Sequence, residues 1–163
     1  MNNKGSITDI VQLAAIAFVF CVVILIGYTI YANFNSEVQA NTDLPTDAKD
    51  ASDKMEAHFS GVLDNAVLFV VFGLGIVAFT LAALVRVHPV FLFLYFIVLL
   101  VVVIVCGALS NAYQEMAASD QLAPYAANLG VSMAIMTYLP MIVGVLGTLL
   151  AIVMYKSWRE NAA

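Results

Sequence analysis

Charge is what this sequence has least of. Only 10% of the residues are charged, whereas an average soluble domain has roughly 25%. Hydrophobic residues make up 63% of the chain and the mean hydropathy is +0.98. A soluble domain of this size buries only about two-thirds of the surface that its unfolded chain exposes, so it could not hide this much apolar surface from water. The composition predicts a single-domain, all-α integral membrane protein surrounded by lipid.

Reactive and metal-binding residues are also scarce. Cys21 and Cys106 both lie in apolar runs, with no CxxC spacing and no nearby histidine, so neither a disulfide nor a metal site is expected. His58 lies in an acidic segment and His88 in a short turn, and no Ser-His-Asp or Cys-His arrangement can be built from them. We therefore expect no catalytic residues, no cofactor and no metal.

Basic residues are few as well. The chain has 6 Lys and Arg against 11 Asp and Glu, for a net charge of -5. Recognition of phosphate backbones needs clustered Lys and Arg. We therefore expect no specific nucleic-acid binding.

Four apolar runs are long enough to cross a bilayer, which takes about 20 residues in a helix. They lie at about residues 10–33, 62–86, 89–110 and 131–156. Arg86, His88 and Pro89 form a tight turn between the second and third runs, with Pro89 in the first turn of the third helix, where its missing N–H costs nothing. Pro140, inside the fourth run, is expected to kink that helix.

Small residues within these runs favour close helix packing. The glycines concerned are Gly73, Gly75, Gly107, Gly144 and Gly147. The four predicted membrane cores contain no Asp, Glu, Lys or Arg, because Asp64 and Lys156 fall at predicted helix ends. A proton-coupled transporter is therefore not expected. Polar core residues such as Thr29 and Thr80 are expected to bond to a neighbouring helix or to the backbone of the preceding turn.

Residues 34–61 form the only long polar stretch. We expect the second helix to begin near Pro45 and the first to run past Phe34, so that together they form an acidic helical hairpin outside the membrane. A spacing of three and four marks one helical face, made of Ala48, Ala51, Met55, Phe59, Val62, Leu63 and Ala66. Two interpretations remain open, a solvated and partly frayed loop or a docking element for a partner. The candidate docking residues are Asp43, Asp47, Asp50, Asp53 and Glu56.

The segment 111–130 connects the third and fourth runs. Its apolar and aromatic residues predict a short interfacial helix interrupted by Pro124. That helix would use Tyr113, Met116, Leu122, Tyr125 and Leu129. Four spans would place Lys4, Arg86, Lys156 and Arg159 on one side of the membrane. By the positive-inside rule, both termini are then cytoplasmic or topologically equivalent to it.

Three phrases carry a family resemblance: HPVF at 88–91, SNAYQEMA at 110–117 and YLPMIVGVLGTLLAIVMY at 138–155. In these the chain resembles small multi-span membrane proteins of tailless, membrane-containing double-stranded DNA viruses. The resemblance implies a multi-copy component of the virion's internal membrane, lying beneath the capsid. The acidic hairpin would then face the capsid protein.

These observations favour a structural integral membrane protein in a virion internal membrane or a host inner membrane. Its expected partners are membrane lipids, further copies of itself or other membrane proteins, and the capsid protein. Two alternatives stay open: a holin-like pore or lysis protein, which would permeabilise a host on expression, and an accessory subunit of a larger membrane complex, which would co-purify with an active partner.

Overall fold

The computed structural model describes residues 7–84 and 89–160, so Arg86 and His88 lie outside the described residues. The elements, in chain order, are α1 (Ile7–Ala40), α2 (Thr46–Leu84), α3 (Pro89–Ala117), α4 (Ala123–Ala126), α5 (Gly130–Thr137) and α6 (Leu139–Glu160). Four stretches within them are long and apolar enough to cross a membrane: Val11–Ala40, Thr46–Thr80, Val90–Ala117 and Leu139–Lys156. The chain is thus an all-helical, multi-pass membrane protein.

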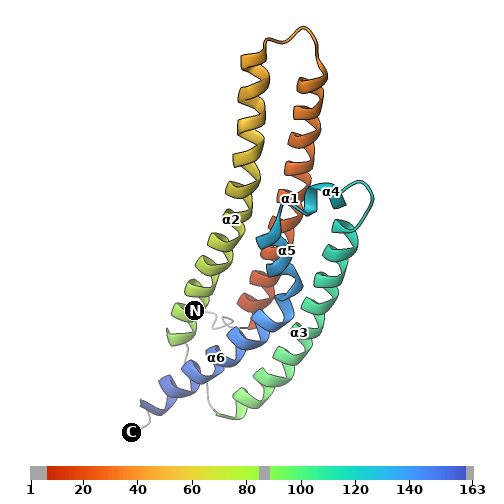
Figure 1. Cartoon of the computed structure of the whole chain (residues 1–163). Coiled ribbons are helices and arrows are strands. Elements are labelled where there is room, and N and C mark those ends of the chain that lie inside the picture. The colour runs from red at the N-terminus through yellow and green to blue at the C-terminus, as the bar shows by residue number, and fades with distance from the viewer. Residues whose placement is uncertain (1–6, 85–88, 161–163) are drawn as a thin grey trace.

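The long helices form a bundle in which each buries one face. On α1 the buried residues recur every three or four positions, as Ala17, Cys21, Ile24 and Tyr28 show. α1 packs chiefly against α2, and α3 chiefly against α6, while α2 also contacts α6 and α1 also contacts α3 (Figure 1). The opposite faces carry large exposed apolar side chains, up to 84% exposed at Phe69. Such surfaces are stable in lipid and would aggregate in water.

A close helix approach joins α3 to α6 at Gly147. A Cβ at Gly147 would lie 2.3 Å from Cδ1 of Leu99, closer than real atoms come. The Tyr95 hydroxyl donates a hydrogen bond to the Gly147 carbonyl oxygen at 2.9 Å. A Cβ at Gly144, one turn earlier, would lie 3.7 Å from Val103, which is an ordinary contact. Packing within the chain therefore favours glycine at Gly147, where a Cβ would displace the Leu99 side chain, and tolerates alanine at Gly144.

The other three glycines expected at helix contacts have a different setting. A Cβ at Gly73, Gly75 or Gly107 would meet nothing within 4 Å. Gly73 is exposed, whereas Gly75 is buried. Close helix approach inside this chain does not account for glycine at these positions.

The prolines mark helix boundaries. Pro89 is the first residue of α3, as predicted. Pro140 is the second residue of α6, two residues after Tyr138, where φ of -94° and ψ of 8° separate α5 from α6, so the predicted kink in the last run is confirmed. Pro124 lies in the first turn of α4 and does not interrupt it, because proline is well suited to that turn.

The prediction of a short interfacial helix between the third and fourth runs was wrong about where that helix begins and ends. Tyr113 and Met116 belong to α3, which continues to Ala117, and only Ala123–Ala126 forms a separate helical turn. Tyr113 is fully buried, so the last turns of α3 are held by packing rather than lying along a membrane surface.

Candidate functional site

The last turns of α1 and the first turns of α2 form a helical hairpin that extends beyond the end of α3 (Figure 1). A five-residue turn, 41–45, joins the helices. In the turn, the backbone N–H of Asp43 donates to Oδ1 of Asn41 at 2.9 Å. α2 then begins directly after Pro45, and α1 runs past Phe34 to Ala40, so the predicted bounds of these two helices are confirmed.

A hydrogen-bond network centred on Asn35 joins the two arms of this hairpin. The Asn35 side chain is only 4% exposed. Its amide donates to Oδ1 of Asp53 at 2.9 Å and to a carboxylate oxygen of Glu56, and its carbonyl oxygen accepts from the Ser52 hydroxyl. Hydrogen bonds to carboxylates are stronger than those between neutral groups. One buried amide therefore holds three side chains of α2 against α1.

One turn further out, Gln39 and Lys49 continue the network. The Gln39 amide donates to Oδ1 of Asp53 at 2.8 Å and to the Lys49 carbonyl oxygen at 2.9 Å. The Lys49 ammonium donates to the Gln39 carbonyl oxygen at 2.9 Å. Several bonds between the same two helices fix their relative position better than any one of them could.

The apolar face that the sequence pattern predicted for α2 is only partly the face that packs on α1. Phe59, Leu63 and Ala66 are partly buried, but Met55 is 60% and Val62 66% exposed, and Ala48 and Ala51 are exposed as well. The face that packs on α1 instead carries Ser52, Asp53 and Glu56, because the buried amide of Asn35 needs hydrogen-bond partners there.

The five candidate docking residues divide into two groups. Asp43, Asp47 and Asp50 are exposed on the turn and the first turns of α2. Asp53 and Glu56 accept the hydrogen bonds from α1, and Glu56 is half-buried. The first group presents exposed carboxylates on the surface, and the second group joins the two arms of the hairpin.

Substituting Asn35 with leucine is expected to loosen the hairpin without disturbing the membrane part of the bundle. The change leaves Asp53, Glu56 and Ser52 without their bonds to the Asn35 side chain, and each hydrogen bond to a charged group is worth about 1.5–3 kcal/mol. Hydrogen exchange of backbone amides in 33–56 should accelerate by at least about tenfold, equivalent to about 1.4 kcal/mol.

The matched control is Ser36→Ala, because Ser36 is exposed and adjacent to Asn35. Its exchange rates should stay at the wild-type values. Wild-type protection of the hairpin in Asn35→Leu would show that the network does not stabilise the hairpin.

Asp64 forms a second polar contact, between α2 and the start of α5. The side chain is 7% exposed. Its carboxylate accepts from the backbone N–H of Val131 at 2.7 Å, and from both the N–H and the hydroxyl of Ser132 at 2.6 Å. The first N–H groups of a helix have no partner inside the helix, and the helix dipole favours a negative charge beside them. Leu129, at the N-cap of α5, supplies no side-chain bond, so Asp64 caps α5 from another helix.

Two tyrosines attach the connection between α3 and α5 to α1. The Tyr125 hydroxyl donates to Oδ1 of Asn33 at 2.6 Å, and the Asn128 amide donates to the Tyr28 hydroxyl at 3.2 Å. The rings of Tyr28 and Tyr125 meet edge to face, with centroids 6.3 Å apart. These contacts and the Asp64 cap join α1 and α2, below the hairpin, to the connection between α3 and α5 and to the first turn of α5.

Thr29 and Thr80 bond to the backbone of the preceding turn, as expected. The Thr29 hydroxyl donates to the Leu25 carbonyl oxygen at 2.8 Å, and the Thr80 hydroxyl donates to the Ile76 carbonyl oxygen at 2.9 Å. Both bonds lie within one helix turn. The buried Tyr113 hydroxyl, by contrast, has no hydrogen-bond partner among the described residues.

In the part of the chain that the structure describes, no three His, Cys, Asp or Glu side chains come together as metal ligands would. Cys21 and Cys106 are buried and free. The polar groups at the hairpin instead join helices. The described residues form a helical bundle with four helices long and apolar enough to cross a membrane and a helical hairpin at one end. Comparisons with protein families, curated proteins and solved structures found no match.

Proposed function

We propose that this chain is a structural integral membrane protein whose α1–α2 hairpin stands outside the bilayer and docks a partner. One observation carries the proposal: the bonds of Asn35 and Gln39 hold the two arms together, while Asp43, Asp47 and Asp50 remain exposed. A rigid element that already has its binding shape loses less conformational entropy when a partner binds.

The distribution of charge along α2 supports a hairpin in water. Asp47, Lys49, Asp50, Asp53, Lys54 and Glu56 follow one another within three helical turns. Each would be costly in hydrocarbon. Apart from Met55 and Val62, the large exposed apolar side chains of α2 lie further along, from Leu68 and Phe69 onward. A bilayer surface near Asp64 would let α2 project by roughly 27 Å, at 1.5 Å per residue.

The resemblance to virion membrane proteins suggests the setting. In the proposed setting, many copies of the chain lie in the internal membrane of a virion. Both termini, with Lys4 and Lys156, are on the cytoplasm-equivalent side, and the hairpin faces the capsid protein on the other side. A partner complementary to three exposed aspartates carries Lys or Arg at its contact surface.

Neutralising the exposed acids is expected to abolish docking while the fold persists. In the triple variant Asp43→Asn, Asp47→Asn and Asp50→Asn, the protein should still enter membranes, but capsid-protein shells should no longer co-sediment with vesicles that contain it. Added salt should also weaken wild-type docking, because dissolved ions screen exposed charges from one another. The screening length is about 8 Å at physiological ionic strength and shortens as salt is added.

The control replaces two exposed acids away from the hairpin, Glu115→Gln and Asp120→Asn, and should dock as the wild type does. Unchanged co-sedimentation of the triple variant would contradict a docking role for the hairpin. Absence of the protein from the membrane fraction of purified virions would contradict the viral setting. Permeabilisation of a host on expression would favour the pore alternative.

A further inference from the structure

An apolar groove lies on the bundle surface between α2 and the α5–α6 helices. Its volume is about 530 Å³. It is lined by Leu68, Val71, Phe72, Gly75, Ile76, Phe79, Ile135, Met141, Ile142, Val145 and Leu146. No lining side chain carries a charge or a hydroxyl, amide or ring N–H group, so the groove offers nothing to a polar ligand.

The groove has the length of one lipid tail. Along α2 it runs from Leu68 to Phe79, which is about 16 Å at 1.5 Å per residue. Half of a hydrocarbon core is about 15 Å thick. Leu68 lies one turn beyond Asp64, the residue that we place near the bilayer surface, so the groove spans the leaflet on the hairpin side.

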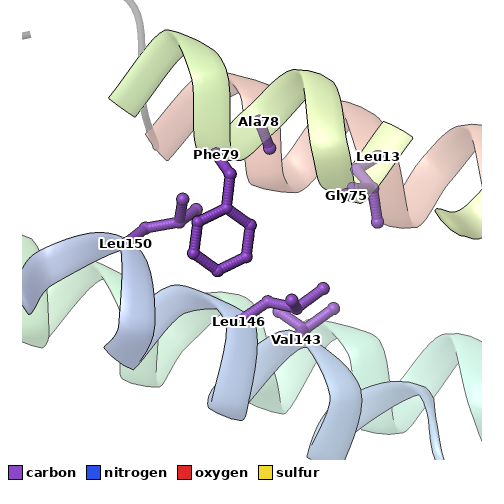
Figure 2. Close-up of a pocket in the computed structure, with 7 residues that line it drawn as sticks. All are labelled: Leu13, Gly75, Ala78, Phe79, Val143, Leu146 and Leu150. Atoms are coloured by element: carbon purple, nitrogen blue, oxygen red, sulfur yellow. The ribbon is translucent and has the colours of Figure 1, made fainter. Parts of the chain in front are cut away.

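Gly75 forms the floor of the groove. Its position is buried, yet a Cβ there would meet nothing within 4 Å. A small gap of about 10 Å³ adjoins this floor and shares Gly75, Phe79 and Leu146 with the groove. Figure 2 shows the Phe79 side chain reaching from α2 into the space beside Leu146 and Leu150 of α6. Helix packing therefore leaves room for additional atoms beside Gly75.

We propose that the groove is a binding site for one acyl chain of a phospholipid from the surrounding bilayer. The glycine at Gly75 keeps the floor open for the chain, and the exposed side chains of Phe72 and Met141 stand on opposite sides of it. A chain that moves from the bilayer into the groove gains no hydrophobic transfer energy, because lipid tails are as apolar as the lining, so shape complementarity and dispersion contacts decide the preference.

The shape of the space beside Gly75 favours an acyl chain over a helix of a second copy. The groove continues inward there to the small gap beside Phe79, between α2 and α6. A thin flexible chain can enter between the two helices, whereas a helix, which is about 10 Å or more across with its side chains, could insert only single side chains.

The test compares two glycines on the same helix, using a phospholipid with a photoreactive diazirine in its acyl chain. Gly75→Leu fills the floor, whereas Gly73→Leu adds the same side chain at an exposed position. After irradiation in vesicles, wild-type protein should carry adducts on the peptides that contain Phe72 and Met141. The yield of these adducts should fall about tenfold in Gly75→Leu, which corresponds to about 1.4 kcal/mol, and should be unchanged in Gly73→Leu.

A milder variant guards against misfolding. Gly75→Ala has room for its methyl group and should fold as the wild type does, with an intermediate adduct yield. Equal yields in wild type, Gly75→Ala and Gly75→Leu would overturn the proposal. The proposal would also be overturned if the groove of the wild type were labelled no more strongly than the exposed α3 face at Phe93. That result would mean that only bulk lipid contacts the groove. A disulfide-linked dimer formed by Met141→Cys, and lost on adding Gly75→Leu, would show that a second copy is the occupant.

Discussion

Asp64→Ala is expected to destabilise the folded protein by about 3–5 kcal/mol, a large loss for a single substitution. The carboxylate accepts three hydrogen bonds at the start of α5, two of them from backbone N–H groups. Removing it leaves these donors buried without a partner, at about 1–3 kcal/mol each. The favourable interaction with the α5 dipole, about 0.3–1 kcal/mol, is lost as well. Reversible unfolding in mixed detergent micelles measures the change.

Two further variants separate capping from charge. Asp64→Asn keeps one carbonyl oxygen as an acceptor and should lose about half as much stability as Asp64→Ala. Asp50→Ala removes an exposed carboxylate from the same helix and should change stability by less than about 0.5 kcal/mol. If Asp64→Ala and Asp50→Ala were equally mild, the contact between α2 and α5 would not stabilise the fold.

Gly147→Ala is expected to destabilise the bundle by about 1–3 kcal/mol, the usual cost of adding a methyl group to a packed contact. The new Cβ would lie 2.3 Å from Cδ1 of Leu99, so the leucine side chain or one of the helices α3 and α6 must move. Movement of the helices would also stretch the 2.9 Å bond from Tyr95 to the Gly147 carbonyl oxygen. The matched control is Gly144→Ala, whose Cβ makes an ordinary contact and should be nearly neutral.

A double-mutant cycle with Leu99→Ala shows whether this contact is responsible. Leu99→Ala alone should cost about 2–5 kcal/mol, because Leu99 is only 6% exposed. In the double variant the alanine methyl at Gly147 enters the vacated space, so the combined loss should be smaller than the sum of the two single losses by about 1 kcal/mol. Strict additivity would mean that Gly147 and Leu99 do not interact as the structure indicates.

The helices were largely predictable because their signals are local. Pro89 opens α3, Pro45 precedes α2 and Pro140 interrupts the last membrane run, since each proline acts on its own turn of the chain. Four runs of sufficient length and apolarity likewise need no tertiary information.

The polar contacts were not predictable, because each depends on a partner far away in the sequence. Asp64 lies three residues after the acidic segment 34–61, and nothing nearby distinguishes a solvated aspartate from one that caps a helix 67 residues later. Asn35 likewise gave no local sign that it would be buried. Spacing alone also misassigned the inner face of α2, since Met55 and Val62 follow the helical period as well as Ser52 and Glu56 do.

The central claim, that four helices lie in lipid while the α1–α2 hairpin lies in water, is tested most directly by cysteine labelling in sealed vesicles with a membrane-impermeant maleimide. Cys21 and Cys106 are buried and can first be replaced by alanine. The Asp50→Cys variant should label rapidly in vesicles of one orientation, and Ile104→Cys, at a position 64% exposed on α3, should stay unlabelled until the protein is unfolded in denaturant. Equal labelling of both positions in intact vesicles would show that water, not lipid, surrounds these apolar helices.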